Sequence, residues 1–152
     1  KIVEYLHKTY EDQLSADPAV MKKVLRDVAF YAPAESYGIS LSSHATGWFP
    51  PELNNLSPPQ SGGYGGQEHD LQKPEGALTR AFGADGIKYM SIRDLSEGLS
   101  QIDFDYIIFD ACFMSSIEAI YELRNNADYI LSSPVEVMGI GFPLHKVIPK
   151  IF

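Results

Sequence analysis

Residues 104–116, FDYIIFDACFMSS, decide the fold of this chain. The first seven residues form a nearly continuous apolar run, which is typical of a strand buried on both faces of a parallel sheet. Asp110 ends that run, and Cys112, the only cysteine in the sequence, follows two residues later. The stretch therefore predicts a buried strand with a carboxylate and a thiol at its carboxyl end.

A helix is expected directly after this strand. Ser115 and Glu118 fit a capping box, in which each side chain bonds to the backbone amide of the other residue. The spacing of Ile117, Ile120 and Tyr121 predicts that these three side chains face the core.

Further strands and helices are expected on either side of this unit. GISLSS (38–43) is predicted to be a strand, and ADYILSS (127–133) is predicted to be another buried strand. A helix should begin at Asp17 and Pro18, because aspartate caps helices well and proline fits their first position. The S-x-x-D pattern that opens SIRDLSEGLSQI starts a further helix.

The alternation of helices and strands predicts an α/β fold, a three-layer α/β/α sandwich with a mainly parallel sheet. We expect residues 1–152 to form a single domain with a long surface loop at about 47–90, where Pro, Gly, Asn and Ser are dense. Within that region, AFGADGIKYMS is consistent with a short hairpin that turns at Asp85 and Gly86.

Composition excludes several classes of function. The 152 residues carry a formal net charge of −8, which argues against a nucleic-acid binder and favours a cationic partner. One cysteine excludes an internal disulfide and a cysteine-rich metal site. No run of 18 apolar residues suggests a membrane span, and no His or carboxylate spacing suggests zinc.

The carboxyl ends of parallel strands are where ligands bind in such sheets. His44, Cys112 and Ser133 all fall at those ends. A cysteine there, just before a helix, lies near the positive end of the helix dipole, which favours the thiolate, and His44 is suited to exchange a proton with it. The alternative is that Cys112 is a small buried apolar residue. His7, His69 and His145 are expected to be surface residues.

Two longer stretches, YGISLSSHATGW and DYIIFDACFMSSIEAIYEL, together resemble the clostripain-like cysteine peptidases of the caspase-like clan. That family has a strand followed by His-Gly-x-Gly-Trp, and later a strand followed by Asp-Ala-Cys-x-Met. ADYILSSPVEVMGIGFP is similar to the segment that comes next in the family. The resemblance covers residues 36–49 and 104–152, and it implies a caspase-like fold that is incomplete in this chain.

The resemblance implies a role for each matching residue. His44 matches the catalytic histidine and Cys112 the nucleophile, and the family cleaves peptide bonds after Arg or Lys. Asp110 matches the acidic floor of the S1 pocket, where a carboxylate would pair with a basic P1 side chain. The alternative for Asp110 is a structural cap on a nearby loop amide. Trp48 is either a wall of the pocket or a core anchor.

The resemblance also implies an oxyanion hole formed by the amides of Cys112 and Ala45. The family usually has Gly where this chain has Ala45. If that position required a positive φ, alanine would be strained there by about 1 kcal/mol. Ala45 is therefore the feature that favours an alternative function, a catalytically weakened caspase-like module that binds basic peptides. A further alternative is a cysteine hydrolase of non-peptide amides.

Members of the family are often zymogens that are cleaved between the His and Cys motifs. The bond after Arg80 is the preferred site for such self-cleavage, and the resemblance implies secretion or a location at the bacterial cell surface or in the periplasm. No cofactor is expected, although some relatives use calcium. The acidic residues considered as calcium ligands show no EF-hand spacing; they are Glu68, Asp70, Glu75 and Asp85.

Overall fold

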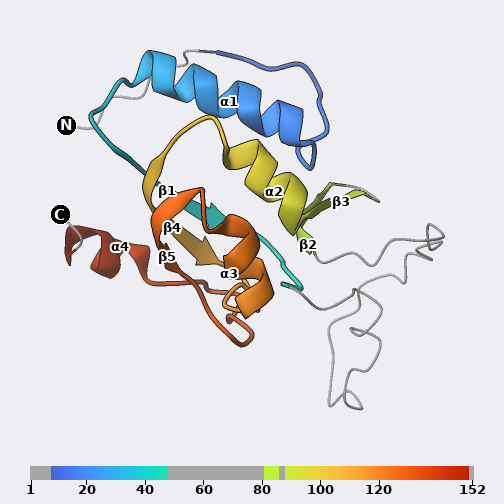
Figure 1. Ribbon diagram of the computed structural model, residues 1–152, viewed down its shortest axis with the longest axis vertical. Coiled ribbons are helices and arrows are strands. Elements are labelled where there is room, and N and C mark those ends of the chain that lie inside the picture. Colours follow the sequence, from blue (N-terminus) through green and yellow to red (C-terminus); the bar gives the residue numbers. More distant parts are fainter. Residues whose placement is uncertain (1–7, 48–80, 86–87, 151–152) are drawn as a thin grey trace.

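The computed structural model describes residues 8–47, 81–85 and 88–150. Its elements are α1 (Pro18–Tyr31), β1 (Tyr37–Ser42), β2 (Ala81–Asp85), β3 (Lys88–Ser91), α2 (Ile92–Leu99), β4 (Phe104–Asp110), α3 (Ile117–Leu123), β5 (Ala127–Leu131), α4 (Leu144–Val147) and a short 3-10 helix, Ile148–Lys150 (Figure 1).

The main sheet has three parallel strands in the order β1-β4-β5. The predicted strand FDYIIFD is β4 and lies in the middle, so that Ser42 at the end of β1 is in register with Asp110 at the end of β4. The α/β class and the mainly parallel sheet are confirmed. Because the strands are parallel, their carboxyl ends meet at one edge of the sheet.

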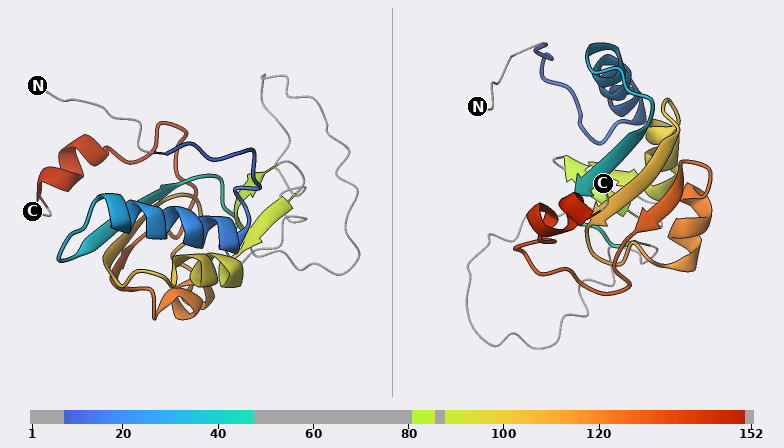
Figure 2. Two further views of the ribbon diagram at one scale, coloured as in Figure 1. Left: turned by 90° about the horizontal axis from the view of Figure 1, so that it is seen from above. Right: turned by 90° about the vertical axis from the view of Figure 1, so that its left-hand side faces the viewer.

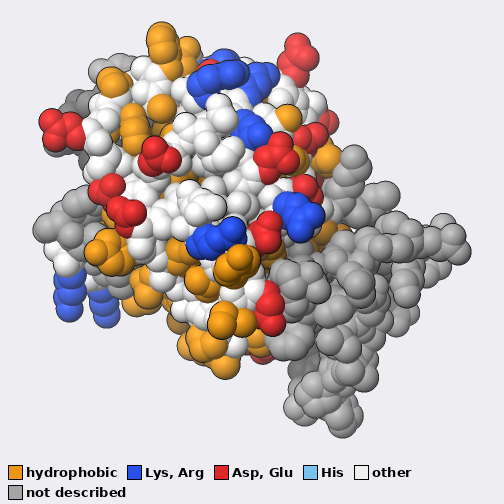
Figure 3. Space-filling model, in the orientation of Figure 1, with side chains coloured by type: hydrophobic (Ala, Val, Ile, Leu, Met, Phe, Trp, Pro, Cys, Tyr) orange, Lys and Arg blue, Asp and Glu red, His pale blue; other side chains and the backbone are white. Residues whose placement is uncertain are grey.

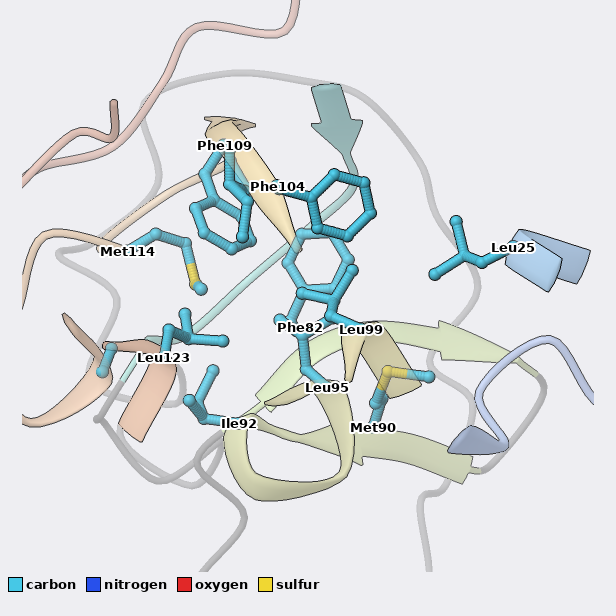
Figure 4. Close-up of a cluster of buried hydrophobic side chains, with 13 residues drawn as sticks. Leu25, Phe82, Met90, Ile92, Leu95, Leu99, Phe104, Phe109, Met114 and Leu123 are labelled. Atoms are coloured by element: carbon cyan, nitrogen blue, oxygen red, sulfur yellow. The ribbon is translucent and has the colours of Figure 1, made fainter. Parts of the chain in front are cut away.

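One face of the sheet carries the hydrophobic core. Helices α1, α2 and α3 all lie on this face (Figure 2), and Leu95 and Leu99 of α2 pack in one cluster with Ile107 and Phe109 of β4. Burial of each such side chain stabilises the fold by roughly 1.5–3 kcal/mol. Figure 4 shows Phe82, Leu95 and Leu99 converging with Phe109.

The opposite face of β5 is exposed, and the prediction that this strand is buried on both sides was wrong. Tyr129 and Leu131 keep 76% and 48% of their surface exposed. The register pairs Tyr106 of β4 with Tyr129 and with Gly38 of β1, so these three residues share the face that points away from α1, α2 and α3. Apolar residues in β5 therefore do not imply two covered faces.

Two of the predicted helix starts are confirmed. Asp17 caps α1 by accepting a hydrogen bond from the amide of Ala19 at 2.7 Å, and Pro18 is the first helical residue. At α2, Ser91 and Asp94 form a complete capping box, in which each side chain accepts from the other residue's amide.

The start of α3 lies one residue later than predicted. Ser116 is its N-cap and accepts from the amide of Ala119 at 3.3 Å. Ser115 instead donates its amide to the carbonyl oxygen of Ser133 at 3.1 Å. The residue that was predicted to cap the helix thus ties the end of β4 to the end of β5.

The core-facing side of α3 also differs from the prediction. Ala119 and Leu123 are buried, whereas Ile117 and Tyr121 are 79% and 64% exposed. Ile120 is partly buried. Figure 3 shows acidic and basic side chains interspersed with apolar ones on the face formed by the helices. Helix α3 therefore packs against the core through Ala119 and Leu123, and Ile117 and Tyr121 lie on its outer side.

The predicted hairpin is confirmed as β2 and β3, which pair antiparallel. The predicted loop of 47–90 is correspondingly too long, because Ala81 and Phe82 are buried in the core. Residues 48–80 lie outside the described part of the chain. Among the described residues, no helix is both long and apolar enough to cross a membrane.

Candidate active site

One cavity at the carboxyl edge of the sheet brings together the three side chains that were predicted to act. Its volume is about 280 Å³, and His44, Asp110 and Cys112 all line it. His44 comes two residues after the end of β1, and Cys112 two residues after the end of β4. The loop that follows β5, the third strand of the sheet, also lines the cavity, with Val137 and Met138.

The thiol of Cys112 is held by the loop after β5. Its Sγ accepts a hydrogen bond from the amide of Val137 at 3.3 Å and lies 3.8 Å from the carbonyl oxygen of the same residue. The turn after β4 is fixed to this loop by the amide of Phe113, which donates to the carbonyl oxygen of Val135 at 3.2 Å. Cys112 is only partly buried and faces a cavity, which excludes the role of a packed core residue.

The structure places Cys112 outside the first turn of the helix whose dipole was predicted to favour its thiolate. Helix α3 begins at Ile117, and the turn of residues 113–116 separates it from Cys112. A helix dipole acts mainly within its first turn. The polar group that the structure places against the sulfur is instead the N–H of Val137.

His44 is positioned through its backbone. Its carbonyl oxygen accepts from the amide of Gly83 at 2.8 Å, and the amide of Thr46 donates to the carbonyl oxygen of Ala81 at 3.0 Å. Strand β2 therefore fixes the segment after β1, while the His44 side chain is exposed. Within the described residues, no hydrogen bond joins the imidazole to the thiol, and such contacts often tighten only when substrate binds.

The amides of Ala45 and Cys112 are free to donate to a ligand. Ala45 faces Phe82 in an isolated antiparallel pair in which the cross-strand hydrogen bonds come from the neighbouring residues, so its own N–H points away from β2. Neither amide donates to another described residue. The positive φ in this turn is at Gly47, at 55°, and Ala45 is not in that region. The strain considered for alanine therefore does not arise.

Gly47 lets the His44 segment approach the Cys112 turn closely. A Cβ at Gly47 would lie 2.1 Å from the carbonyl oxygen of Phe113. Phe113 itself has a positive φ of 58°. The backbone of Gly47 thus lies so close to the backbone of Phe113 that a side chain at position 47 would not fit, and only glycine permits this contact.

The carboxylate of Asp110 is fixed by the turn that closes the loop after β5. Its Oδ1 accepts from the amide of Phe142 at 2.9 Å. Gly141 has a φ of 67°, and a Cβ there would lie 2.3 Å from Oδ2. Asp110 thus caps a loop amide, as the alternative reading of the sequence predicted, and it also lines the cavity. Among the described residues, no Lys or Arg forms an ion pair with it.

Other predicted residues lie elsewhere. Ser133 does not line the cavity, because its hydroxyl accepts from the amide of Val135 at 3.2 Å and its carbonyl oxygen is bonded to Ser115. His145 lies exposed at α4, as expected. Several predicted residues fall outside the described part of the chain, namely His7, Trp48, Glu68, His69, Asp70, Glu75 and Arg80.

The described residues hold no group of three or more His, Cys, Asp or Glu that could bind a metal ion. Asp85 accepts from both the amide and the hydroxyl of Ser15. The prediction of no cofactor, with calcium as an unassigned alternative, therefore stays a prediction.

The sequence reasoning missed the backbone donors from the loop after β5. The amides of Val137 and Phe142 reach Cys112 and Asp110 across 25 and 32 residues of sequence. Backbone groups leave no signature in a sequence. The available signal was the Gly-x-Gly at Gly139 and Gly141, which indicates a tight turn after a strand.

This geometry agrees with comparisons to known proteins. The model of the clostripain family of peptidases (C11) matches residues 64–152, which is more than half of the chain. A secreted C11 cysteine protease from Bacteroides thetaiotaomicron, solved in complex with an irreversible peptide inhibitor, is 36% identical with a TM-score of 0.71. That alignment covers 95% of this chain and 35% of that one.

Two further structures are similar. Iotapain, also a secreted C11 protease from B. thetaiotaomicron, is 29% identical with a TM-score of 0.70 over 95% of this chain and 38% of its own. An inactive zymogen C11 protease from Parabacteroides distasonis is 33% identical with a TM-score of 0.62 over 91% of this chain and 32% of its own.

A comparison with curated proteins gave no match. The chain spans about a third of the length of the solved structures that it resembles. The matched segment includes the strand β4, the Cys112 turn and the loop that holds it, and the fold is the α/β fold of those proteases. This chain belongs to the clostripain family of cysteine peptidases.

Proposed function

We propose that this chain carries the active site of a cysteine endopeptidase that hydrolyses peptide bonds after Arg or Lys. The observation that carries the proposal is that a thiol, an imidazole and a carboxylate line one cavity at the carboxyl edge of the sheet. These groups serve as nucleophile, proton carrier and P1 selector. The neighbour that was solved with a peptide inhibitor supports a peptide as the substrate class.

The reaction uses Cys112 and His44 as a dyad. The thiol proton passes to His44, and Sγ attacks the carbonyl carbon of the scissile bond. The oxyanion accepts hydrogen bonds from the free amides of Cys112 and Ala45. His44 then gives its proton to the leaving amine, the C–N bond breaks, and water hydrolyses the thioester that remains on Cys112.

Asp110 selects the basic P1 residue in this proposal. Its Oδ1 is committed to the amide of Phe142, which orients the carboxylate in the cavity. A guanidinium or ammonium group that enters the cavity would find a carboxylate without a cationic partner among the described residues. A charge-assisted hydrogen bond of this kind is stronger than a neutral one.

The proposal is tested by covalent labelling. An acyloxymethyl ketone with Arg at P1 should label Cys112 in the purified protein, with the added mass located by peptide mass spectrometry. His44→Ala should lose labelling while its circular dichroism spectrum is unchanged. A wild-type protein that is not labelled, before and after treatment with trypsin, would instead support the module that only binds basic peptides.

Activation by self-cleavage is part of the proposal, at the bond between Arg80 and Ala81. Ala81 begins β2, is buried, and donates its amide to the hydroxyl of Thr46 at 3.2 Å. The first turnover must therefore loosen this end of the hairpin. Intact-mass analysis should show a break after Arg80 in the wild type and none in Cys112→Ala. A break at another bond, or no break, removes the idea.

Secretion is proposed on the strength of the secreted relative. Fractionation of the source cells, followed by immunoblotting, should find the protein outside the cytoplasm. Recovery in the cytoplasmic fraction alone would contradict this.

A further inference from the structure

We infer that Met138 and Ile140 form the contact surface for an aliphatic side chain at P2, the residue that precedes the basic P1 residue. This inference rests on the proposed function and specifies the substrate further. It names the side chains that would recognise a second position of the peptide.

Met138 and Ile140 present apolar side chains beside the cavity that contains Cys112. Ile140 is 86% exposed and Met138 is 75% exposed, although both are large apolar residues. Met138 also lines the cavity that holds Asp110 and Cys112. Adjacent exposed apolar side chains beside a cavity that holds reactive groups are typical of a surface that is covered when a ligand binds.

The turn that presents these two side chains is fixed at both ends. Val137 is bonded to Cys112 at one end, and Phe142 to Asp110 at the other. Between them, the amide of Gly141 donates to the carbonyl oxygen of Met138 at 2.8 Å. Binding to a surface that is already ordered loses little conformational entropy, which favours recognition.

The strand order determines which side of the substrate meets this turn. β4 lies between β1 and β5, so His44 follows the strand on one side of Cys112 and the loop with Met138 follows the strand on the other. His44 must reach the leaving amine to protonate it, which places the primed residues on the β1 side. The P1 and P2 residues therefore lie on the β5 side, beside Met138 and Ile140.

There is room for an extended peptide along this turn. A Cβ added at Gly139, which also lines the cavity, would meet no atom of the described residues within 4 Å. Because neighbouring side chains of an extended peptide point to opposite sides, a P1 side chain that enters the cavity leaves the P2 side chain at the rim. An aliphatic P2 residue would there cover apolar surface of Met138 and Ile140.

The test compares rates of cleavage for peptides that differ only at P2. Fluorogenic substrates with Arg at P1 and with Leu or Ser at P2 are assayed with wild type, Met138→Ser, Ile140→Ser and the double variant. Ile117→Ser is the matched control, because Ile117 is 79% exposed but lies on α3 and outside the cavity. Thermal unfolding checks that all variants are folded.

Wild type and Ile117→Ser should prefer Leu over Ser by roughly tenfold in kcat/KM, as expected for a few buried methylene groups. The double variant should lose most of this preference while it keeps its preference for Arg at P1. The inference about P2 would be overturned if the wild type cleaved after Arg with no preference at P2, or if the double variant kept the preference of the wild type. Either result would leave the proposed function standing. Failure to cleave or label with any Arg substrate would instead overturn the proposed function.

Discussion

In the proposed function, Asp110 has a structural role and also a role in substrate selection. The hydrogen bond from Phe142 holds its carboxylate against Gly141 and inside the cavity. A cap on a loop amide and a P1 selector are therefore compatible, because the first fixes the orientation that the second requires.

Gly141→Ala should impair recognition of the basic P1 residue. The new Cβ would lie 2.3 Å from Oδ2 of Asp110, and the alanine would have to adopt a φ of 67°. The carboxylate or the turn must therefore shift. We expect KM for an Arg substrate to rise about tenfold with a smaller change in kcat, as for loss of binding. Gly139→Ala, whose Cβ meets open space, should have a much smaller effect, and equal effects would contradict the account.

The residues of the site could be predicted from the sequence to different degrees. His44 and Cys112 were predicted because they follow strand ends, and Asp110 because of the resemblance to a family motif; the structure brings all three to one cavity. Ser133, which was also predicted at a strand end, does not line that cavity. The amides of Val137 and Phe142 could not be found, since any residue except proline supplies an amide. Their identity depends on how the loop after β5 folds back.

The segment after β1 and the turn after β4 act as a pair of elements. Strand β2 holds the first through the carbonyl oxygen of His44. The segment meets the second at Gly47, beside Phe113. The distance between imidazole and thiol is therefore set by two backbone contacts and not by the side chains alone.

Gly47→Ala should separate these two elements. Its Cβ would lie 2.1 Å from a backbone oxygen, which cannot move as a flexible side chain would. We expect kcat to fall by at least tenfold, because small misplacements of reacting groups are costly. Gly83→Ala has a similar φ of 71°, and its Cβ would come no closer than 3.4 Å to Ser43. Because the Gly83 amide also holds the carbonyl oxygen of His44, we expect some loss of kcat in this variant, but a smaller one than in Gly47→Ala. An equal loss in the two variants would contradict the role of the close approach at Gly47.

The segment before α1 is held by Asp27, and this contact should depend on pH. The hydrogen bond from Lys8, and then that from Tyr10, hold the pKa of Asp27 below its ordinary value near 3.8. A lowered pKa means that the contact stabilises the folded state above that value and is lost as the pH falls below it. Protection of residues 8–16 against hydrogen exchange, taken relative to the intrinsic rate at each pH, should thus fall as the pH falls below about 3.8. Asp27→Asn should show no such change, and an unaltered pH dependence would contradict the assignment.

In the described part of the molecule, one core connects helices α1, α2 and α3, the sheet and the hairpin that positions the histidine. Phe82 of β2 packs edge-on against Phe109 of β4, with ring centroids 5.6 Å apart. Both belong to the cluster that also contains Leu95 and Met114. Stability and the geometry of the site therefore share the same side chains.

Phe82→Ala should reduce the free energy of unfolding by about 3–5 kcal/mol, as for other large-to-small changes in a core. Urea unfolding measures this change. Tyr129→Ala, at a side chain that is 76% exposed, is the control and should change the stability by less than about 0.5 kcal/mol. A loss below about 1 kcal/mol for Phe82→Ala would show that the hairpin is not part of the core.

Much of the architecture could be predicted because parallel strands and capped helices leave patterns in the sequence. The bounds of β4 and the cap of α2 agree with those patterns. The exposure of β5 and the outer side of α3 could not be predicted, because apolar residues such as Tyr129 and Ile117 indicate burial only when another layer covers them. Which faces are covered is a property of the packed molecule.

The most direct test of the account replaces the charge of the P1 residue and of its proposed partner together. Cleavage rates are compared for two peptides that differ only in Arg or citrulline at P1, a neutral side chain of nearly the same shape, with wild type and Asp110→Asn. The wild type should prefer Arg by at least a hundredfold in kcat/KM, about 2.7 kcal/mol, and the variant should lose most of that preference while Cys112 is still labelled by an iodoacetamide. Equal cleavage of both peptides by the wild type, or a preference for Arg that persists in Asp110→Asn, would contradict the account.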